Sequence, residues 1–230
     1  MISTNVDVPF VDKTFLDIVH ARKILKQENP LLLTNIMPVN IENIILSNGL
    51  NITPTFISKD RSIHGMIVCG KGDVSLWNNK NKCYEDEFCN GKTIFIDSLL
   101  TAPNMINRYR FTLAHEFSHW LLHRSIVNKI AKEKKVLSFL SCTEREINCE
   151  IIEQAEARCE WQANYLAGAI LMPYLPLKKY CENITIEHDT VADKINNITY
   201  LASSYSVSLK AMYVRLRQLE YIDFIDYFEQ

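Results

Sequence analysis

The spacing of apolar residues divides the chain into helical and extended segments. Apolar residues recur at helical spacing over residues 39–52, with an interruption at Asn48-Gly49, which predicts a short helix that leads into a strand. Over residues 52–97, short β-rich runs alternate with turns rich in Gly, Asn, Asp and Lys. This alternation predicts a small, mainly antiparallel sheet. We interpret the acidic run at residues 84–88 as a solvated loop between its strands.

Two long helices are predicted after residue 104. The first carries apolar residues at positions i, i+4, i+7 and i+8, which form one face of a helix: Leu113, Phe117, Trp120 and Leu121. The second begins at a capping-box pattern over residues 143–146 and ends before Met172-Pro173, because proline cannot continue a helix. We expect the charged stretch between the two helices to loop out.

A pair of shorter helices is predicted over residues 201–222, joined by a tight Ser-Val-Ser turn with Ser208 as the N-cap. This pattern resembles a helix-turn-helix, in which basic side chains meet phosphates; the basic residues here are Lys210, Arg215 and Arg217. However, residues 210–230 contain three basic and four acidic side chains. Such a balance does not provide the positive surface that DNA binding requires, so we interpret the segment as a docking or packing module.

Composition and charge narrow the class of protein. A chain of 230 residues that is 47% hydrophobic can bury one sizeable core without disulfides. The net charge of −2 favours neither a nucleic acid nor an anionic membrane as partner. Seven cysteines without a CxxC pattern indicate reduced thiols. With no targeting pattern and no apolar run long enough for a membrane span, we expect a cytoplasmic protein.

The first long helix carries the pattern HExxH at residues 115–119. Histidines at positions i and i+4 project from the same helix face, so ring nitrogens of His115 and His119 can reach one zinc ion. Glu116 lies about 100° around the helix from His115, where a carboxylate can take a proton from a zinc-bound water. We interpret Glu116 as a general base and not as a ligand. The apolar face lies opposite the histidines, which leaves room for a cleft.

A catalytic zinc ion needs a third protein ligand in addition to His115 and His119. His123 lies about 12 Å from His115 along a straight helix, and one ion cannot bind residues at both ends of that span. We therefore interpret His123 as a packed residue or as one that supports a ligand. The second long helix offers three candidate carboxylates, between which spacing does not decide: Glu153, Glu156 and Glu160.

Two blocks of the sequence resemble the ImmA/IrrE family of metallopeptidases. The first is RFTLAHEFSHWLLH, residues 110–123, and the second is EWQANYLAGAILMP, residues 160–173. A weaker resemblance covers most of residues 39–222. The resemblance implies that Glu160 is the third metal ligand, beside His115 and His119, and that Glu116 is the catalytic residue.

The same resemblance implies a fold and a division of the chain. We expect an α+β, zincin-like metallopeptidase whose small, mainly antiparallel sheet packs on the HExxH helix. A second helix carries the remaining ligand, and a C-terminal helical segment follows. The expected parts are an N-terminal extension at residues 1–38, a peptidase domain at residues 39–176, and a C-terminal segment at residues 177–230 with a pattern like that of a helix-turn-helix.

The implied activity is that of a site-specific endopeptidase with one catalytic Zn²⁺, for which Mn²⁺ stays an alternative. Its implied substrate is a transcriptional repressor of the helix-turn-helix type, whose cleavage derepresses mobile-element, prophage or stress-response genes. We expect no membrane partner and no direct binding to nucleic acid. The alternatives are a zinc-bound sensor that does not cut and a DNA-binding regulator that acts through the C-terminal segment. An oxyanion stabiliser is also expected, with Tyr165, His123 and Arg110 as candidates.

Overall fold

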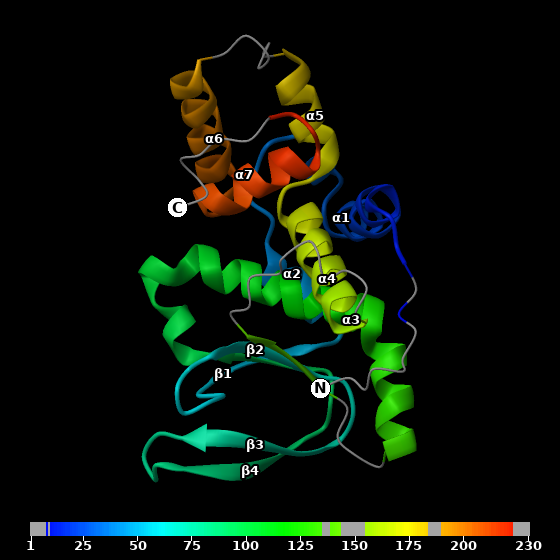
Figure 1. Ribbon diagram of the computed structural model, residues 1–230, viewed down its shortest axis with the longest axis vertical. Helices are drawn as coiled ribbons and strands as arrows, with labels where there is room; N and C mark the ends of the chain where they lie inside the picture. Colours follow the sequence, from blue (N-terminus) through cyan, green and yellow to red (C-terminus); the bar gives the residue numbers. More distant parts are fainter. Residues whose placement is uncertain (1–7, 9, 135–138, 144–154, 184–189, 223–230) are drawn as a thin grey trace. The chain divides into compact units, whose positions relative to one another are not determined.

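The computed structural model describes residues 8, 10–134, 139–143, 155–183 and 190–222 (Figure 1). The chain forms two compact units, each built from separate stretches of sequence. The first comprises Met1–Asp12 and Ile41–Ala167, and the second comprises Lys13–Asn40 and Gly168–Gln230. The boundaries expected after residues 38 and 176 stay predictions.

The first unit contains two sheets and the beginning of the second long helix. Its helices are α2 (Ile41–Ser47), α3 (Ile106–Lys134) and the first part of α4 (Ala155–Leu171), with short 3₁₀ turns η3 (Ser98–Thr101) and η4 (Pro103–Met105) before α3. Its strands are β1 (Asn51–Thr55), β2 (Ile63–Val68), β3 (Gly72–Asn78), β4 (Cys83–Cys89), β5 (Thr93–Asp97) and β6 (Phe139–Thr143). The larger sheet has the order β1-β5-β2-β6, and β3 pairs with β4 in a hairpin.

Strand pairing confirms a mainly antiparallel arrangement among the described strands. Only β1 and β5 run parallel, whereas β2 is antiparallel to both β5 and β6, and β3 is antiparallel to β4. The expected passage from a short helix to a strand is also confirmed, by α2 and β1. The molecule is therefore a mixed α+β protein with a small sheet and several helices.

The central strand β2 separates two layers of packing, because successive residues of a strand point to opposite faces. Met66 and Val68 belong to a buried apolar cluster with residues of the β3–β4 hairpin, including Val74 and Leu76. On the other face, Gly65 lies directly against α3. Figure 1 shows the hairpin and α3 on opposite sides of the larger sheet. The HExxH helix is thus supported along the sheet, as expected.

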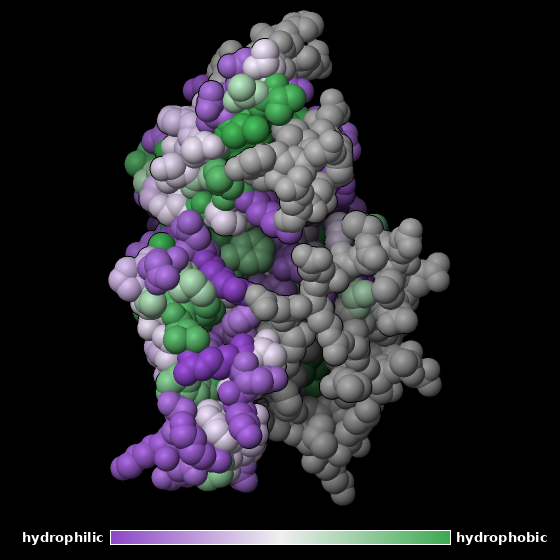
Figure 2. All heavy atoms as spheres, turned by 60° about the vertical axis from the view of Figure 1, so that its left-hand side comes forward, coloured by the Kyte–Doolittle hydropathy of each residue, from purple (hydrophilic) through white to green (hydrophobic). Residues whose placement is uncertain are grey.

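Two expectations for loops in this unit are wrong. Residues 84–88 belong to strand β4, although their side chains are exposed as expected; pairing with β3 and an edge contact between the Trp77 and Tyr84 rings, with centroids 5.2 Å apart, hold the strand. Figure 2 shows hydrophilic side chains over the end of the molecule that carries this hairpin. The stretch after His123 also does not simply loop out, because α3 continues to Lys134 and β6 joins the sheet.

Helices make up the described part of the second unit. They are a π-helical turn η1 (Phe15–Ala21), α1 (Arg22–Glu28), a 3₁₀ turn η2 (Pro30–Leu33), the end of α4, α5 (Tyr174–Asn183), α6 (Val191–Tyr205) and α7 (Leu209–Gln218). As predicted, α4 ends before Met172-Pro173, and the Ser208 hydroxyl caps α7 by accepting a hydrogen bond from the Ala211 amide at 3.1 Å. The capping box predicted at residues 143–146 lies mostly outside the described residues.

A buried ion pair joins distant parts of the sequence inside this second unit. The Arg215 guanidinium on α7 bonds to the Asp17 carboxylate on η1 and donates to the Met172 carbonyl at 3.2 Å. Arg215 is only 1% exposed, so it cannot meet a phosphate. The observation corrects the sequence interpretation, which counted Arg215 among the basic side chains of a helix-turn-helix pattern.

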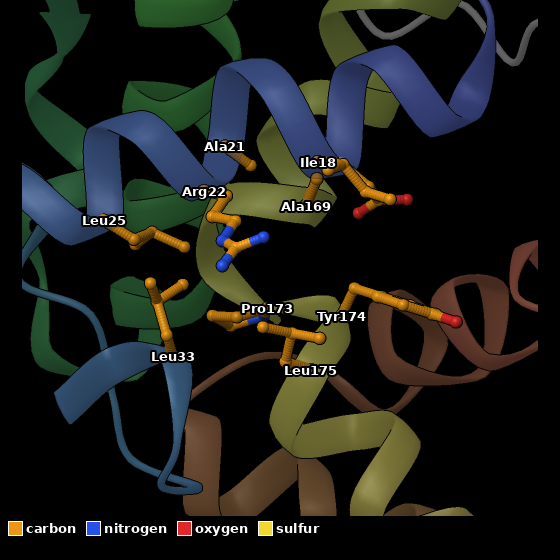
Figure 3. A pocket seen from close by; sticks show the side chains of 10 residues that line it. Ile18, Ala21, Arg22, Leu25, Leu33, Ala169, Pro173, Tyr174 and Leu175 are labelled. Atoms are coloured by element: carbon orange, nitrogen blue, oxygen red, sulfur yellow. The ribbon is translucent and has the colours of Figure 1, made fainter. Parts of the chain in front are cut away.

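A small pocket also lies within the second unit (Figure 3). Its lining is mostly apolar and comes from η1, α1, η2, the end of α4 and the start of α5. Figure 3 shows the Arg22 side chain extending from its helix into the space beside Pro173. Elsewhere, none of the described helices combines the length and the apolar composition needed to cross a membrane. Five cysteines are free thiols: Cys69, Cys83, Cys89, Cys159 and Cys181.

Candidate metal centre

Helix α3 places two histidines side by side inside the first unit. The helix forms there because Leu113, Phe117 and Trp120 give it an apolar face, and all three are buried. One turn apart, His115 and His119 direct their Nε2 atoms toward each other at 2.9 Å. Their exposures are 1% and 0%, whereas the Glu160 side chain is 32% exposed, and the cleft expected beside the histidines stays a prediction.

Helix α4 completes the cluster with the Glu160 carboxylate. Its Oε2 lies 3.3 Å from Nε2 of His115, and its Oε1 lies 3.2 Å from Nε2 of His119. The three residues can offer one ligand atom each, all within 4.8 Å of one another. Tetrahedral zinc with bonds of about 2.0–2.1 Å holds its ligand atoms about 3.3 Å apart, so the donor set fits such an ion. The structure brings together the three ligands that the resemblance implied.

The three candidate carboxylates of the second long helix differ in where they lie. Glu156 lies one turn before Glu160 on α4, while Glu153 lies outside the described residues. Burial by itself favours a raised pKa for Glu160, but hydrogen bonds from His115 and His119 hold this pKa well below its usual value. The Glu160 carboxylate is therefore ionised, which is the state in which a carboxylate binds a metal ion.

Glu116 lies in the same buried region but outside the ligand cluster. Its exposure is 0%, and neither carboxylate oxygen has a close hydrogen-bond partner among the described residues. Burial raises the pKa of Glu116 to about 8, and the nearby His115 and the backbone amide of Ile67 oppose part of this increase. A buried carboxylate with so little hydrogen bonding is costly in its ionised form, so Glu116 does not stabilise the fold as an anion.

A glycine in β2 makes room for this carboxylate. A Cβ atom at Gly65 would lie 2.9 Å from both Cγ and Oε1 of Glu116, and 2.6 Å from Cγ2 of Thr112. Both distances are shorter than real Cβ contacts allow. Sequence reasoning missed Gly65, because its role depends on the register between β2 and α3.

The outer ring nitrogens of both histidine ligands also have partners. Nδ1 of His115 lies 2.9 Å from Oδ1 of Asn164, and Nδ1 of His119 lies 3.0 Å from Nδ1 of His123. Nε2 of His123 lies in turn 2.9 Å from Oε1 of Gln162. Burial, followed by the influence of His119, lowers the pKa of His123 to about 4. His123 is thus both buried and in contact with His119, which agrees with either of the two interpretations left open by the sequence.

The two amides on α4 differ in how far the sequence pointed to them. Asn164 follows Glu160 by four positions, which places both on one helix face, and it belongs to the second block of the family resemblance. Gln162 carries no such signal. Of the remaining oxyanion candidates, Tyr165 is buried with its ring 5.5 Å from that of Trp161, and Arg110 is half-buried near the start of α3. Their role stays a prediction.

Comparison with known proteins places these elements in one family. The model of the family described as Peptidase_M78, IrrE N-terminal-like domain, matches residues 67–217. That range covers more than half of the chain and includes the HExxH helix and α4. A comparison with curated proteins gave no match. The resemblance to ImmA/IrrE proteins is thereby confirmed: the chain belongs to the Peptidase_M78 family, and this membership indicates a metallopeptidase.

Proposed function

We propose that the protein is a zinc-dependent endopeptidase of the zincin-like type. One observation carries the proposal. The ligand set His115, His119 and Glu160, brought together from two helices, adjoins the fully buried carboxylate of Glu116. Two histidines and a carboxylate form one of the usual ligand sets of catalytic zinc in peptidases, and such sites leave a position open for water or substrate.

The residues of this chain have distinct parts in the proposed reaction. His115, His119 and Glu160 would hold the ion, which when bound supplies Lewis acidity toward a peptide carbonyl and lowers the pKa of water. Glu116 accepts the proton of the attacking water on a carboxylate oxygen and delivers it to the leaving amine nitrogen. Its burial suits this role, since burial raises the affinity of a carboxylate for a proton.

The proposed substrate is a helix-turn-helix repressor encoded near the gene of the protease. Support comes from the resemblance of residues 110–123 and 160–173 to ImmA/IrrE proteins. Cleavage of the repressor in the cytoplasm would derepress mobile-element, prophage or stress-response genes. The proposal makes a protein, and not a nucleic acid, the partner of this chain.

A cleavage assay tests this proposal directly. Wild-type protein with zinc is incubated with repressors encoded beside its gene, and we expect a discrete fragment that a chelator abolishes. Glu116→Gln should retain bound zinc but lose cleavage by a factor of about 10² or more, because the proton acceptor is removed. Cleavage by Glu116→Gln at the wild-type rate would contradict the assignment. Binding of repressor by the wild type without any fragment would favour the sensor.

Metal analysis tests the ligand assignment independently of cleavage. Glu160→Ala should weaken zinc binding by more than about 100-fold, which exceeds the usual effect of changing an outer partner of a ligand. The matched control is Glu182→Ala, which removes an exposed carboxylate that pairs only with Lys178 on the same helix among the contacts described. Competition with a chromophoric chelator measures both affinities. Equal affinities for the two variants would exclude Glu160 as a ligand.

A further inference from the structure

The two nitrogens of His119 face different surroundings. Nε2 belongs to the ligand cluster, with Nε2 of His115 at 2.9 Å and Glu160 Oε1 at 3.2 Å. Nδ1 faces the opposite way, and its neighbour at 3.0 Å is Nδ1 of His123. A metal ligand nitrogen carries no proton, so a neutral His119 that binds through Nε2 must carry its proton on Nδ1.

This requirement determines the protons of the next two side chains. If His119 donates from Nδ1, then Nδ1 of His123 must accept, and the single proton of a neutral His123 lies on Nε2. That proton points at Oε1 of Gln162, 2.9 Å away, and an amide oxygen is an acceptor. With His119 bound to metal through Nε2, this arrangement gives each hydrogen bond one donor and one acceptor. The direction of donation therefore runs from His119 through His123 to Gln162.

Burial makes the arrangement consequential. His119 is 0% exposed, and His123 and Gln162 are each 1% exposed, so bulk water does not replace a lost partner. Removing the terminal acceptor would leave an N–H group of His123 without a bond, and buried polar groups without partners are costly. If His123 instead carried its proton on Nδ1, that proton would point at the Nδ1 proton of His119. This clash would disfavour the His119 tautomer that binds metal.

We propose that His123 and Gln162 are positioning residues that hold His119 in the tautomer and ring orientation needed for metal binding. This inference rests on the proposed metal centre. Outer partners of this kind commonly change metal affinity by about 10–100-fold. The two histidine ligands are thus held differently: His115 has a direct amide acceptor in Asn164, whereas His119 reaches its amide through a second imidazole.

Zinc affinity of full-length variants tests the proposal. Gln162→Leu and His123→Phe keep the side-chain volume roughly constant but remove the acceptor in each step. Each should bind zinc about 10–100-fold more weakly than the wild type by chelator competition. The double variant should bind no more weakly than His123→Phe alone, because the acceptor oxygen of Gln162 reaches His119 through His123. Losses that multiply in the double variant would contradict the relay.

Two further variants separate positioning from general damage to the fold. Gln162→Glu keeps an oxygen acceptor and should retain wild-type affinity. Ser118→Ala removes an equally buried polar group on α3, the helix that carries His123. The Ser118 hydroxyl donates to the Ala114 carbonyl at 2.7 Å, and this variant should also bind zinc normally. Should His123→Phe fail to fold, Gln162→Leu and Gln162→Glu still decide the question.

The readouts distinguish failure of the inference from failure of the metal centre. Absence of zinc binding by the wild type would remove the proposed function itself. Tight binding by the wild type with equal binding by Gln162→Leu would overturn only the inference. Nitrogen-15 spectra of the zinc-loaded protein provide an independent check, with the imidazole proton of His119 expected on Nδ1 and that of His123 on Nε2. A His123 proton on Nδ1 would also overturn the inference.

Discussion

At the scale of single residues, the buried Glu116 carboxyl makes the stability of the protein depend on pH. In the metal-free protein its pKa rises to about 8 through burial, from an ordinary value of 4.5. A folded-state pKa above the unfolded value means that the folded state binds more protons between these two pH values. The contribution of Glu116 to stability is therefore present in full below pH 4.5 and is lost as the pH rises to about 8.

This dependence predicts the behaviour of Glu116→Gln without metal. At pH 5 the variant and the wild type should have similar free energies of unfolding, because both side chains are neutral. At pH 8 the variant should be more stable by about 1–3 kcal/mol, since it avoids a buried charge without a partner. Denaturant unfolding with chelator present measures both. Glu182→Gln, at an exposed position, is the control, and a difference independent of pH would contradict the argument.

The sequence predicted the candidate metal ligands better than it predicted the residues that pack around them. HExxH spacing on a helix fixes how His115 and His119 face each other, whatever the rest of the fold does. The identity of Glu160 among three glutamates came only from family resemblance, because no local rule tells which face of α4 meets α3. Gly65 and Gln162 became visible only in three dimensions, since their roles arise from contacts between elements distant in sequence.

At the scale of elements, the close approach of β2 and α3 sets the position of the Glu116 carboxylate, the proposed proton acceptor. Gly65→Ala places a methyl group within 3.0 Å of Thr112 and Glu116, so either α3 or the Glu116 side chain must move. We expect a loss of peptidase activity of at least about 10-fold, because small displacements of catalytic groups are costly. We also expect a lower thermal midpoint, through overpacking that costs about 1–3 kcal/mol.

Gly168 provides the matched control for this substitution. In α4, an added Cβ would meet Arg215 Cδ and Met172 Cε at 3.8 Å, which is ordinary van der Waals contact. Gly168→Ala should therefore leave activity unchanged and stabilise the helix by up to about 1 kcal/mol. Thermal unfolding and the cleavage assay on both variants test the pair. Equal effects at Gly65 and Gly168 would show that the contact with α3 is not decisive.

Errors in predicting elements had a common physical origin. The run at residues 84–88 is exposed on both faces, so it lacks the alternation that marks a half-buried strand; its pairing with β3 comes from the hairpin and not from burial. The length of α3 was underestimated because charged residues after His123 interrupt the apolar pattern without interrupting the helix. The Ser208 cap of α7 was predicted from local sequence, whereas α5 and the first part of α6, with its capping box at Thr190, were not.

At the scale of the whole molecule, the pairing of Asp17 with Arg215 spans most of the chain and lies inside the second unit. Asp17→Asn leaves a buried guanidinium without its charged partner, and we expect a loss of about 3–5 kcal/mol in the stability of that unit. Replacing both residues, Asp17→Leu with Arg215→Met, should recover most of it, because no charge is then left unpaired. Denaturant unfolding measures the free energy of unfolding of the wild type, of Asp17→Asn and of the double variant.

An exposed ion pair in the same unit gives the contrast. Lys178 and Glu182 lie 3.7 Å apart on α5, with side chains 43% and 60% exposed. Lys178→Gln should change stability by no more than about 0.5 kcal/mol. If Asp17→Asn were equally mild, water would have to reach Arg215, in conflict with its burial.

The Asp17–Arg215 ion pair limits how this protein can be truncated or combined with a relative. The region matched by the family begins at residue 67, yet Arg215 inside that region depends on a carboxylate fifty residues before it begins. A fragment trimmed to the matched region would carry an orphaned cation in its C-terminal helices. A chimera that exchanges these helices with those of a relative should therefore inherit residues 13–40 from the same parent.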